Sequence, residues 1–431
     1  MIFTVYYVAA LVLAVAETRG LLRSRRPVTP QWPGVVWIAT LVVTYAAQIG
    51  LCVAIATRGA WPIAVVQWKP DALPVIALLL LALTQSYALL ALYRSSARTG
   101  ALAIAAVLMA LFSFAPVLTN ADLYAYVGNG LLGRAAYTPP PAPFTGNLAT
   151  INAFWHVPVP AATYGPLWIA IATAVVAAVP TLALKMTAFR LLGAVLLAAL
   201  FVLLRANGTP PRILAIVMLN PALYFEFVLN AHNDLPAVVI LTVAALVASW
   251  WPLAASLLIA AAALIKLPFV VLGLPVLANV RETVPRILAI AVAIVATAIV
   301  SWFGGGAAYA HALVAYASGS HLEGAVHAAA ALAALASIVF AVAGIRRLKS
   351  AVWLLPMFGA YTAPWYALWS LPYALGARPV LVYLAIWLPF VTFIAEPALT
   401  RVWTVAGVLP AAIVLSLVLS QKHQSLQRGP S

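Results

Sequence analysis

Charged residues are scarce in this chain of 431 residues: only 7% are Asp, Glu, Lys or Arg. A soluble domain carries about 25% charged residues, so the composition excludes an ordinary water-soluble fold. The single cysteine, Cys52, excludes a disulfide within the chain and a metal site built from cysteine thiolates. Acidic residues are the rarest charged type, with eight against 23 Lys and Arg. Each acidic residue beside an apolar run is therefore a candidate for a specific structural or functional role.

Long apolar runs recur along the chain, and the first four lie near residues 2–18, 34–57, 74–93 and 101–119. As a helix, each is long enough to cross the ~30 Å hydrocarbon core of a bilayer. Backbone groups in lipid must pair within the segment, and barrel strands would alternate in polarity, so these runs must be helices. The sequence predicts an all-α, polytopic membrane protein with about 11–13 transmembrane helices.

Most arginines stand in short clusters between apolar runs: Arg19/Arg23/Arg25/Arg26, Arg94/Arg98, Arg205/Arg212, Arg281/Arg286 and Arg346/Arg347/Lys349. The net charge of +15 is therefore assigned to the positive-inside bias of cytoplasmic loops rather than to nucleic-acid binding. With these clusters inside, the fourth run emerges at Asn120 on the extracytoplasmic side.

The segment 120–163 is the longest stretch without a membrane run, and its Pro, Tyr and small polar residues favour an ordered surface loop. The following apolar run, 164–183, leaves two alternatives. If it crosses the membrane, the later basic clusters fall outside. If it lies on the outer face, they stay inside, and this second topology is favoured.

We expect one integral membrane domain, 1–420, with N-terminal spans at 1–119, a large external loop with juxtamembrane helices at 120–186, further spans at 187–420, and a polar tail at 421–431. Two later segments are also expected to be external: a loop at 304–324, and an aromatic segment broken by proline at 361–375.

The stretch "NADLYAYVGNG" (120–130) raises two interpretations. Its pattern G-x-G-x-x-G resembles a dinucleotide-binding loop, but no strand precedes it and no acidic residue follows Asp122 before Glu226. The glycines are better explained by close helix packing. Asp122 is either an interfacial charge at a helix N-terminus or a functional group, since charges at this depth are costly. Tyr124, Tyr126, Tyr137 and Arg134 follow it and could bind a polyhydroxylated ligand.

A second polar cluster, "NAHND" (230–234), ends an apolar run on the same predicted side. Asn233 or Asp234 could cap the next helix. A metal site from His232, Asp234 and Asp122 is an alternative, but no H-E-x-x-H spacing supports it. Glu226 is expected to be a buried partner of an Arg or His.

Two basic residues lie within apolar runs, Lys266 in "LIKLP" and Arg190 near the start of a span. Each is a candidate cation for an anionic ligand, with snorkelling as the alternative for Lys266.

These motifs, together with "AAYTPPPAPF", "YGPLWIA" and "APWYALWSLPYAL", resemble the GT-C superfamily of membrane glycosyltransferases. The likeness is greatest to bacterial polyprenyl-phosphate-mannose-dependent α-mannosyltransferases and runs from about 115 to 375. The resemblance implies an extracytoplasmic active site at the cell membrane, a polyprenyl-phosphate sugar donor and a glycan or glycolipid acceptor. It also implies that the transferred sugar is mannose. Many members pair two acidic residues in this loop, whereas Asp122 stands alone, so a metal cofactor is not expected.

The resemblance makes Asp122 the catalytic base. The donor phosphate is expected near Lys266, Arg190 or His232. The substrate-binding residues are expected to be Tyr124, Tyr126, Arg134, Tyr137, Tyr164, Asn233, Asp234, Trp365 and Tyr366.

Two other functions remain as alternatives. A transporter or flippase of lipid-linked sugars would predict internal repeats and charges at the membrane midplane, and no clean repeat is visible. An O-antigen ligase-type oligosaccharide transferase would use a large late loop, whereas here the largest loop comes early.

Overall fold

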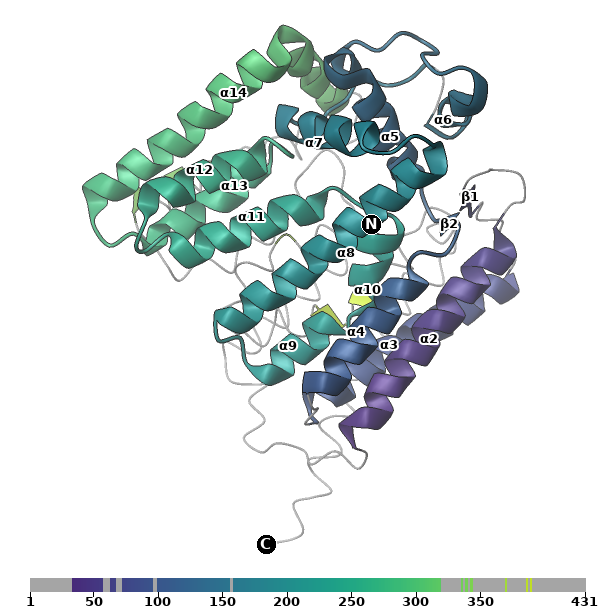
Figure 1. Cartoon of the computed structure of the whole chain (residues 1–431). Helices are drawn as coiled ribbons and strands as arrows, with labels where there is room; N and C mark the ends of the chain where they lie inside the picture. Colours follow the sequence, from purple (N-terminus) through teal and green to yellow (C-terminus); the bar gives the residue numbers. More distant parts are fainter. Residues whose placement is uncertain are drawn as a thin grey trace, which may run out of the picture.

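The computed structural model describes residues 33–56, 63–66, 72–95, 99–155 and 158–318, with isolated positions at 335, 338–339, 342–343, 369, 385–386 and 388–389. Most of this part of the chain is helical (Figure 1). The strands within it are two short ones, β1 (Ala64–Val65) and β2 (Val117–Leu118), which pair in parallel.

Four helical stretches are long and apolar enough to cross a membrane: α2 (Gly34–Ile55), Ile76–Tyr93 of α3 (Ala72–Tyr93), α8 (Leu182–Ala206) and Thr283–Tyr316 of α14 (Thr283–Ser318). A fifth is the bent pair Pro211–Met218 and Pro221–Leu229. Large apolar side chains such as Val43, Leu80 and Val202 are exposed on these helices, as lipid contact requires. The prediction of an all-α, polytopic membrane protein is confirmed, while the total of 11–13 spans involves undescribed residues and stays a prediction.

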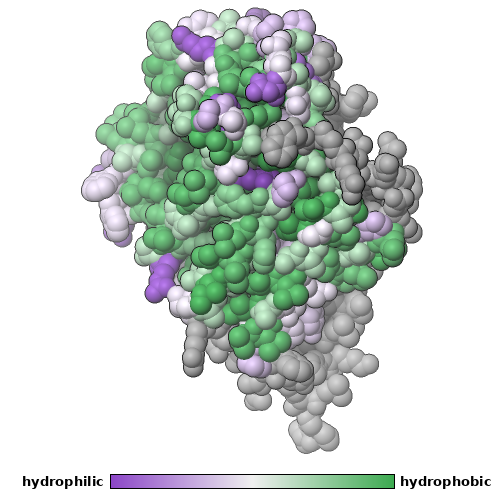
Figure 2. Space-filling model, turned by 45° about the vertical axis from the view of Figure 1, so that its right-hand side comes forward, coloured by the Kyte–Doolittle hydropathy of each residue, from purple (hydrophilic) through white to green (hydrophobic). Residues whose placement is uncertain are grey.

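Helices α2, α3 and α4 (Thr99–Phe112) lie side by side at one edge of the molecule (Figure 1). Buried polar bonds join them, since Gln85 donates to Gln48 at 2.6 Å and the hydroxyls of Tyr45 and Ser113 lie 2.7 Å apart. Figure 2 shows hydrophobic residues over the middle of one face and hydrophilic residues gathered towards its upper end.

The chain between α4 and α8 forms only short helices, α5 (Asp122–Leu132), η1 (Gly133–Tyr137), η2 (Gly146–Leu148), α6 (Ala149–Trp155) and α7 (Pro166–Ala177). Twelve residues of α7 extend about 18 Å, too little for a bilayer core of ~30 Å. This length supports the prediction that 164–183 does not cross. Figure 1 shows α7 at the same end of the molecule as α5.

Glycines bring α5 close to its neighbours. A Cβ on Gly130 would lie 2.5 Å from the carbonyl oxygen of Ala172 in α7, and one on Gly128 would lie 2.6 Å from the Trp155 ring. The prediction that the glycines of this stretch serve close helix packing is confirmed.

After α8 the chain forms α9 (Pro211–Met218), α10 (Pro221–Tyr224), the π-helical turn η3 (Phe225–Leu229), α11 (Asp234–Val247), α12 (Pro252–Ala263), α13 (Phe269–Gly273), η4 (Leu274–Asn279) and α14. The expectation of a loop at 304–324 is wrong for residues 304–318, which are helical. Gly306 breaks the helix at φ 59° and ψ −152°, a conformation that only glycine adopts easily. The alanine-rich sequence then resumes the helix.

The contact between α8 and η3 gives a stability prediction. A Cβ on Gly193 would lie 2.0 Å from the carbonyl oxygen of Phe227, whereas one on Gly50 of α2 would have no heavy atom within 4 Å. We expect Gly193→Ala to destabilise the protein by about 1–3 kcal/mol through overpacking. The control Gly50→Ala should leave stability unchanged or slightly raised. Thermal unfolding of the detergent-solubilised protein measures both, and equal melting temperatures would contradict the proposed contact.

Candidate active site

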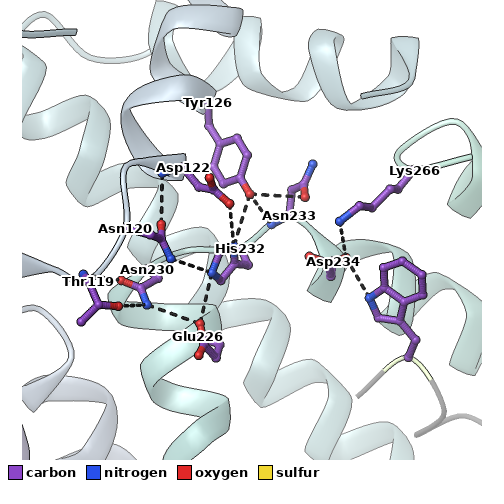
Figure 3. Close-up of polar contacts among 11 residues, drawn as sticks. Thr119, Asn120, Asp122, Tyr126, Glu226, Asn230, His232, Asn233, Asp234 and Lys266 are labelled. Atoms are coloured by element: carbon purple, nitrogen blue, oxygen red, sulfur yellow. Dashed lines mark hydrogen bonds and ion pairs between the residues drawn. The ribbon is translucent and has the colours of Figure 1, made fainter. Parts of the chain in front are cut away.

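Asp122 is the first residue of α5 and lies at the surface of a buried polar network (Figure 3). Its side chain is 40% exposed. Its backbone N–H donates to Asn120 Oδ1 at 3.0 Å, which fixes the start of the helix. A carboxylate at this position is also stabilised by the positive end of the helix dipole. Asp122 is therefore held at its backbone while its carboxylate remains accessible.

An irregular backbone places His232 opposite Asp122. The turn η3 is π-helical, a conformation frequent at functional sites. Ala231 then adopts φ 54°, in the left-handed region that is unfavourable for a residue with a Cβ. The chain folds back here, and His232 N–H donates to the carbonyl of Glu226 at 3.0 Å. This fold puts the side chains of His232 and Glu226 next to each other.

His232 lies between two carboxylates. Its Nδ1 is 3.2 Å from Asp122 Oδ2, and its Nε2 is 3.1 Å from Glu226 Oε2. The side chains of His232 and Glu226 are buried, at 0% and 1% exposed. The prediction that Glu226 is a buried partner of an Arg or His is confirmed.

These contacts control the charges of the network. Burial lowers the pKa of His232, but the hydrogen bonds and charges of Asp122 and Glu226 outweigh it and raise the pKa to about 9. Burial raises the pKa of Asp122, but the hydrogen bond and charge of His232, with help from the Lys266 charge, hold it below its usual value. At neutral pH the network therefore contains an imidazolium and an ionised Asp122.

Asn230 joins this network to the chain before Asp122. Its Oδ1 accepts from the backbone N–H of Thr119 at 3.1 Å, and its Nδ2 donates to Thr119 Oγ1 at 2.7 Å. The same Nδ2 lies 3.3 Å from Glu226 Oε2. The two polar segments, 119–122 and 226–234, are thus bonded directly.

Asp234 and Lys266 form a second charged pair beside the first. Asp234 Oδ1 accepts from Lys266 Nζ and from Trp369 Nε1, both at 2.8 Å. The ammonium also lies 5.2 Å from the centre of the Trp369 ring. The Asp234 side chain is 1% exposed and that of Lys266 is 16% exposed. Asn233 makes no N-cap bond with its side chain, so capping does not account for this cluster.

Arg190 lies behind the site rather than in it. It is 2% exposed, and its three guanidinium nitrogens donate to the carbonyls of Ala115, Val117 and Leu229. These carbonyls precede Asp122 in one segment and His232 in the other. The structure therefore gives Arg190 a part in joining the two segments, and the predicted phosphate contact has no support in this arrangement.

One of the tyrosines predicted to bind substrate touches the network. The Tyr126 hydroxyl donates to Asn233 Oδ1 at 3.4 Å and lies 3.5 Å from His232 Nδ1. Tyr164 and Trp168 pack edge-on against its ring. Tyr126, Tyr164 and Asn233 therefore lie together beside Asp122.

Other predicted substrate residues have different contacts. Tyr124 stacks on Phe154 and donates to the carbonyl of Ile63 at 2.6 Å. Tyr137 donates to the carbonyl of Tyr164 at 3.1 Å. Arg134 donates to the carbonyls of two α14 residues, Phe303 and Gly304. The predicted Trp365 and Tyr366 lie outside the described residues.

Four residues of the site were not singled out by the sequence: Thr119, Asn120, Asn230 and Trp369. A usable signal existed for the asparagines, because each stands two residues before a candidate, Asp122 or His232, at the end of an apolar run. Trp369 falls in the aromatic segment 361–375, but its bond to Asp234 spans 135 residues and no local pattern encodes it. Among the described residues, no group of three or more His, Cys, Asp and Glu is arranged to hold a metal ion.

The place of Arg190 gives a second prediction. Arg190→Gln removes donors from three carbonyls at a buried position, and each unsatisfied buried group costs about 1–3 kcal/mol. We expect a clear loss of thermal stability. Arg205→Gln, at the exposed end of the same helix, should change stability little. If Arg190→Gln keeps full stability and only weakens donor binding, the structural role is wrong.

Comparison with known proteins identifies a family for the chain. Residues 5–281, more than half of the chain, match the model of the MptA/B family, described as alpha-(1→6)-mannopyranosyltransferase, N-terminal domain. No curated protein and no solved structure matches the chain. The matched range contains both polar segments, Lys266 and Arg190. The chain therefore belongs to the MptA/B family of alpha-(1→6)-mannopyranosyltransferases, as the resemblance predicted, and is a glycosyltransferase that transfers mannose.

Proposed function

We propose that the protein transfers one mannosyl residue from a polyprenyl-phosphate donor to a hydroxyl of a glycan or glycolipid, on the extracytoplasmic face of the cell membrane. Asp122 is the general base, and the anomeric carbon is inverted. The observation that carries the proposal is the contrast between Asp122 and the other carboxylates of the site. Asp122 is 40% exposed, whereas Glu226 and Asp234 are 1% exposed.

The state of Asp122 suits a base. Its pKa is held below the usual value, so the carboxylate is ionised at neutral pH and can accept a proton. The bond from His232 falls on Oδ2, which leaves Oδ1 for the acceptor hydroxyl. A base positioned in this way typically contributes ~10²–10⁴-fold to the rate.

One carboxylate is enough for the proposed reaction. The acceptor oxygen attacks the anomeric carbon as its proton passes to Asp122. The bond from the anomeric carbon to the phosphate oxygen breaks on the opposite side, and polyprenyl phosphate leaves with the electron pair. A phosphate leaving group needs no general acid. Inversion of a β-linked donor gives an α-linked product, in keeping with the α-(1→6) linkage of the family description.

Lys266 is the proposed partner of the donor phosphate. Its ammonium lies 2.8 Å from Asp234 Oδ1. Asp234 and Trp369 hold the ammonium in place, so it is oriented before the donor binds. A fixed cation next to the leaving phosphate stabilises the charge that develops there. His232 is not proposed as a phosphate ligand, because both of its ring nitrogens face carboxylates.

A cavity beside Lys266 suits the isoprenoid chain of the donor. It has a volume of about 410 Å³, and its lining includes Leu267, the residue after Lys266. Nearly all of its lining is apolar and comes from α13, η4 and α14, including Val270, Leu274, Ile294 and Leu313. A lipid phosphate could thus place its head group at Lys266 and its chain between these helices.

Tyr126 and Asn233 are proposed to contact the sugar or the acceptor, because they lie between Asp122 and Lys266 (Figure 3). Tyr164, which packs against the Tyr126 ring, is proposed to do so as well, whereas Asp234 is proposed to hold Lys266. No metal cofactor is proposed.

The role of Asp122 is tested by Asp122→Asn. This change keeps the size of the side chain but removes the base, and we expect mannosyl transfer to fall by about 10²–10⁴-fold. The assay uses purified protein, polyprenyl-phosphate mannose and a lipid-linked acceptor, with mass spectrometry of the product. Glu282→Gln, at an exposed carboxylate far along the chain, is the matched control and should keep full activity. Undiminished transfer by a folded Asp122→Asn would refute the assignment.

The cavity is tested separately by Ala298→Phe. Ala298 lines the cavity, and the larger ring should raise the KM for a long-chain polyprenyl donor without changing the KM for a short-chain analogue. Ala291→Phe, at an exposed position two turns earlier in α14, is the control. Equal effects on both donors would place the isoprenoid chain elsewhere.

A further inference from the structure

Glu226 is a fully buried carboxylate that lies behind His232, on the side of the ring away from Asp122. It lies in η3, within an apolar stretch, with 0% of the residue exposed. A buried charge is expensive, and an apolar residue of similar size would often be as stable or more stable. Packing alone therefore gives no reason for a carboxylate here.

The polar contacts of the Glu226 side chain are made by one of its two carboxylate oxygens. Both of its described bonds fall on Oε2, which lies 3.1 Å from His232 Nε2 and 3.3 Å from Asn230 Nδ2. Its Oε1 is buried and has no hydrogen-bond partner among the described residues. The side chain is thus aimed at the ring nitrogen of His232 that lies furthest from Asp122.

Asn120 and Glu226 favour opposite protonation states of that nitrogen. Asn120 Oδ1 accepts from the Asp122 N–H, so its Nδ2, a donor, faces His232 Nε2 at 3.0 Å. Asn120 can donate only if Nε2 carries no proton, whereas Glu226 can accept only if Nε2 carries one. A proton on Nε2 lets Glu226 Oε2 accept a hydrogen bond, whereas a lone pair on Nε2 would face a buried acceptor, which is the costlier arrangement. Because Asp122 Oδ2 faces Nδ1 in the same way, a proton held on Nε2 by Glu226 and one on Nδ1 together give the imidazolium.

We propose that Glu226 is a positioning residue for the base: by accepting from Nε2 it holds His232 as an imidazolium, and so fixes the charge and direction of the hydrogen bond that Asp122 receives. This inference rests on the proposed role of Asp122. Its consequence is that the strength of the base does not vary over the neutral pH range, where an ordinary histidine titrates.

The other groups around His232 do not replace Glu226. Asp122 and the Tyr126 hydroxyl face Nδ1 from α5. Asp234, on α11, is bonded to Lys266 and Trp369, and the Lys266 charge acts on Asp122. Glu226 is the only acidic group among the described residues within 4 Å of Nε2.

The direct test is the titration of His232 in Glu226→Gln. Protein labelled with ¹⁵N-histidine is reconstituted in nanodiscs, and the His232 signal is assigned by its loss in His232→Gln. In the wild type we expect the ring to stay protonated through pH 8, consistent with its pKa of about 9. In Glu226→Gln the midpoint should fall by about 1–3 pH units, the effect of one neighbouring opposite charge. Glu282→Gln is the control and should leave it unchanged.

The activity of the same variants tests the link to the base. Wild-type kcat/KM should show no inflection from His232 between about pH 6.5 and 8.5. Glu226→Gln should acquire one at the new midpoint, with the rate rising with pH, because Asp122 becomes a stronger base as the imidazolium charge is lost. In Glu226→Asp, which keeps a carboxylate, the inflection in kcat/KM should be weaker than in Glu226→Gln. A purely structural role for Glu226 would lower stability without adding an inflection.

The outcomes separate this inference from the proposed function. An unchanged titration of His232 in Glu226→Gln overturns the inference, and so does a shifted titration with a flat activity profile. If the variant does not fold, the wild type alone decides: a His232 midpoint near 6.5 overturns the inference. If Asp122→Asn retains turnover while the titration shifts as expected, the failure lies in the proposed function instead.

Discussion

The guanidinium of Arg190 holds together two segments that are more than a hundred residues apart in the chain. It donates to Ala115 and Val117 on one side and to Leu229 on the other, and α8 brings it to this point because Gly193 lets the helix approach η3 closely. Carbonyls at helix ends and in short strands lack regular partners, and a buried cation with a planar fork of donors can satisfy several of them at once. The bonds of Asn230 to Thr119 and the ion pair of Asp122 with His232 depend on this junction.

The parts of the fold that follow from long apolar runs were predictable from the sequence. The apolar runs 34–57 and 74–93 predicted the membrane helices α2 and α3, because only a helix satisfies the backbone in lipid. The run 101–119 also forms a helix, α4, but this helix is only 14 residues long. Residues 304–318 were expected to form a loop but are helical, and of the three successive glycines there only Gly306 leaves the helix. Helical propensity around a single break, rather than glycine content, decided the structure there.

The site was predictable in its residue types but not in its pairings. Asp122, His232, Asp234 and Lys266 stood out as polar groups in apolar surroundings, and each lies in the site. That Glu226 would bond His232 rather than another cation depends on the π-helical turn and on the positive φ of Ala231. Neither backbone feature can be predicted from the local amino-acid sequence. Arg190 shows the converse, since its charge suggested an anion while its partners are backbone carbonyls.

Burial divides the roles of the three carboxylates. Asp122 and Asp234 both begin helices, where the dipole favours the ionised form, and each has a cationic partner. They differ in access, because Asp234 is 1% exposed and Asp122 is 40% exposed. Asp234, buried against Lys266, can orient the ammonium but is not accessible to an acceptor hydroxyl. Glu226 is buried in the same way behind His232. This difference in access supports Asp122 as the proposed base, with the other two acids proposed to hold the cations on either side of it.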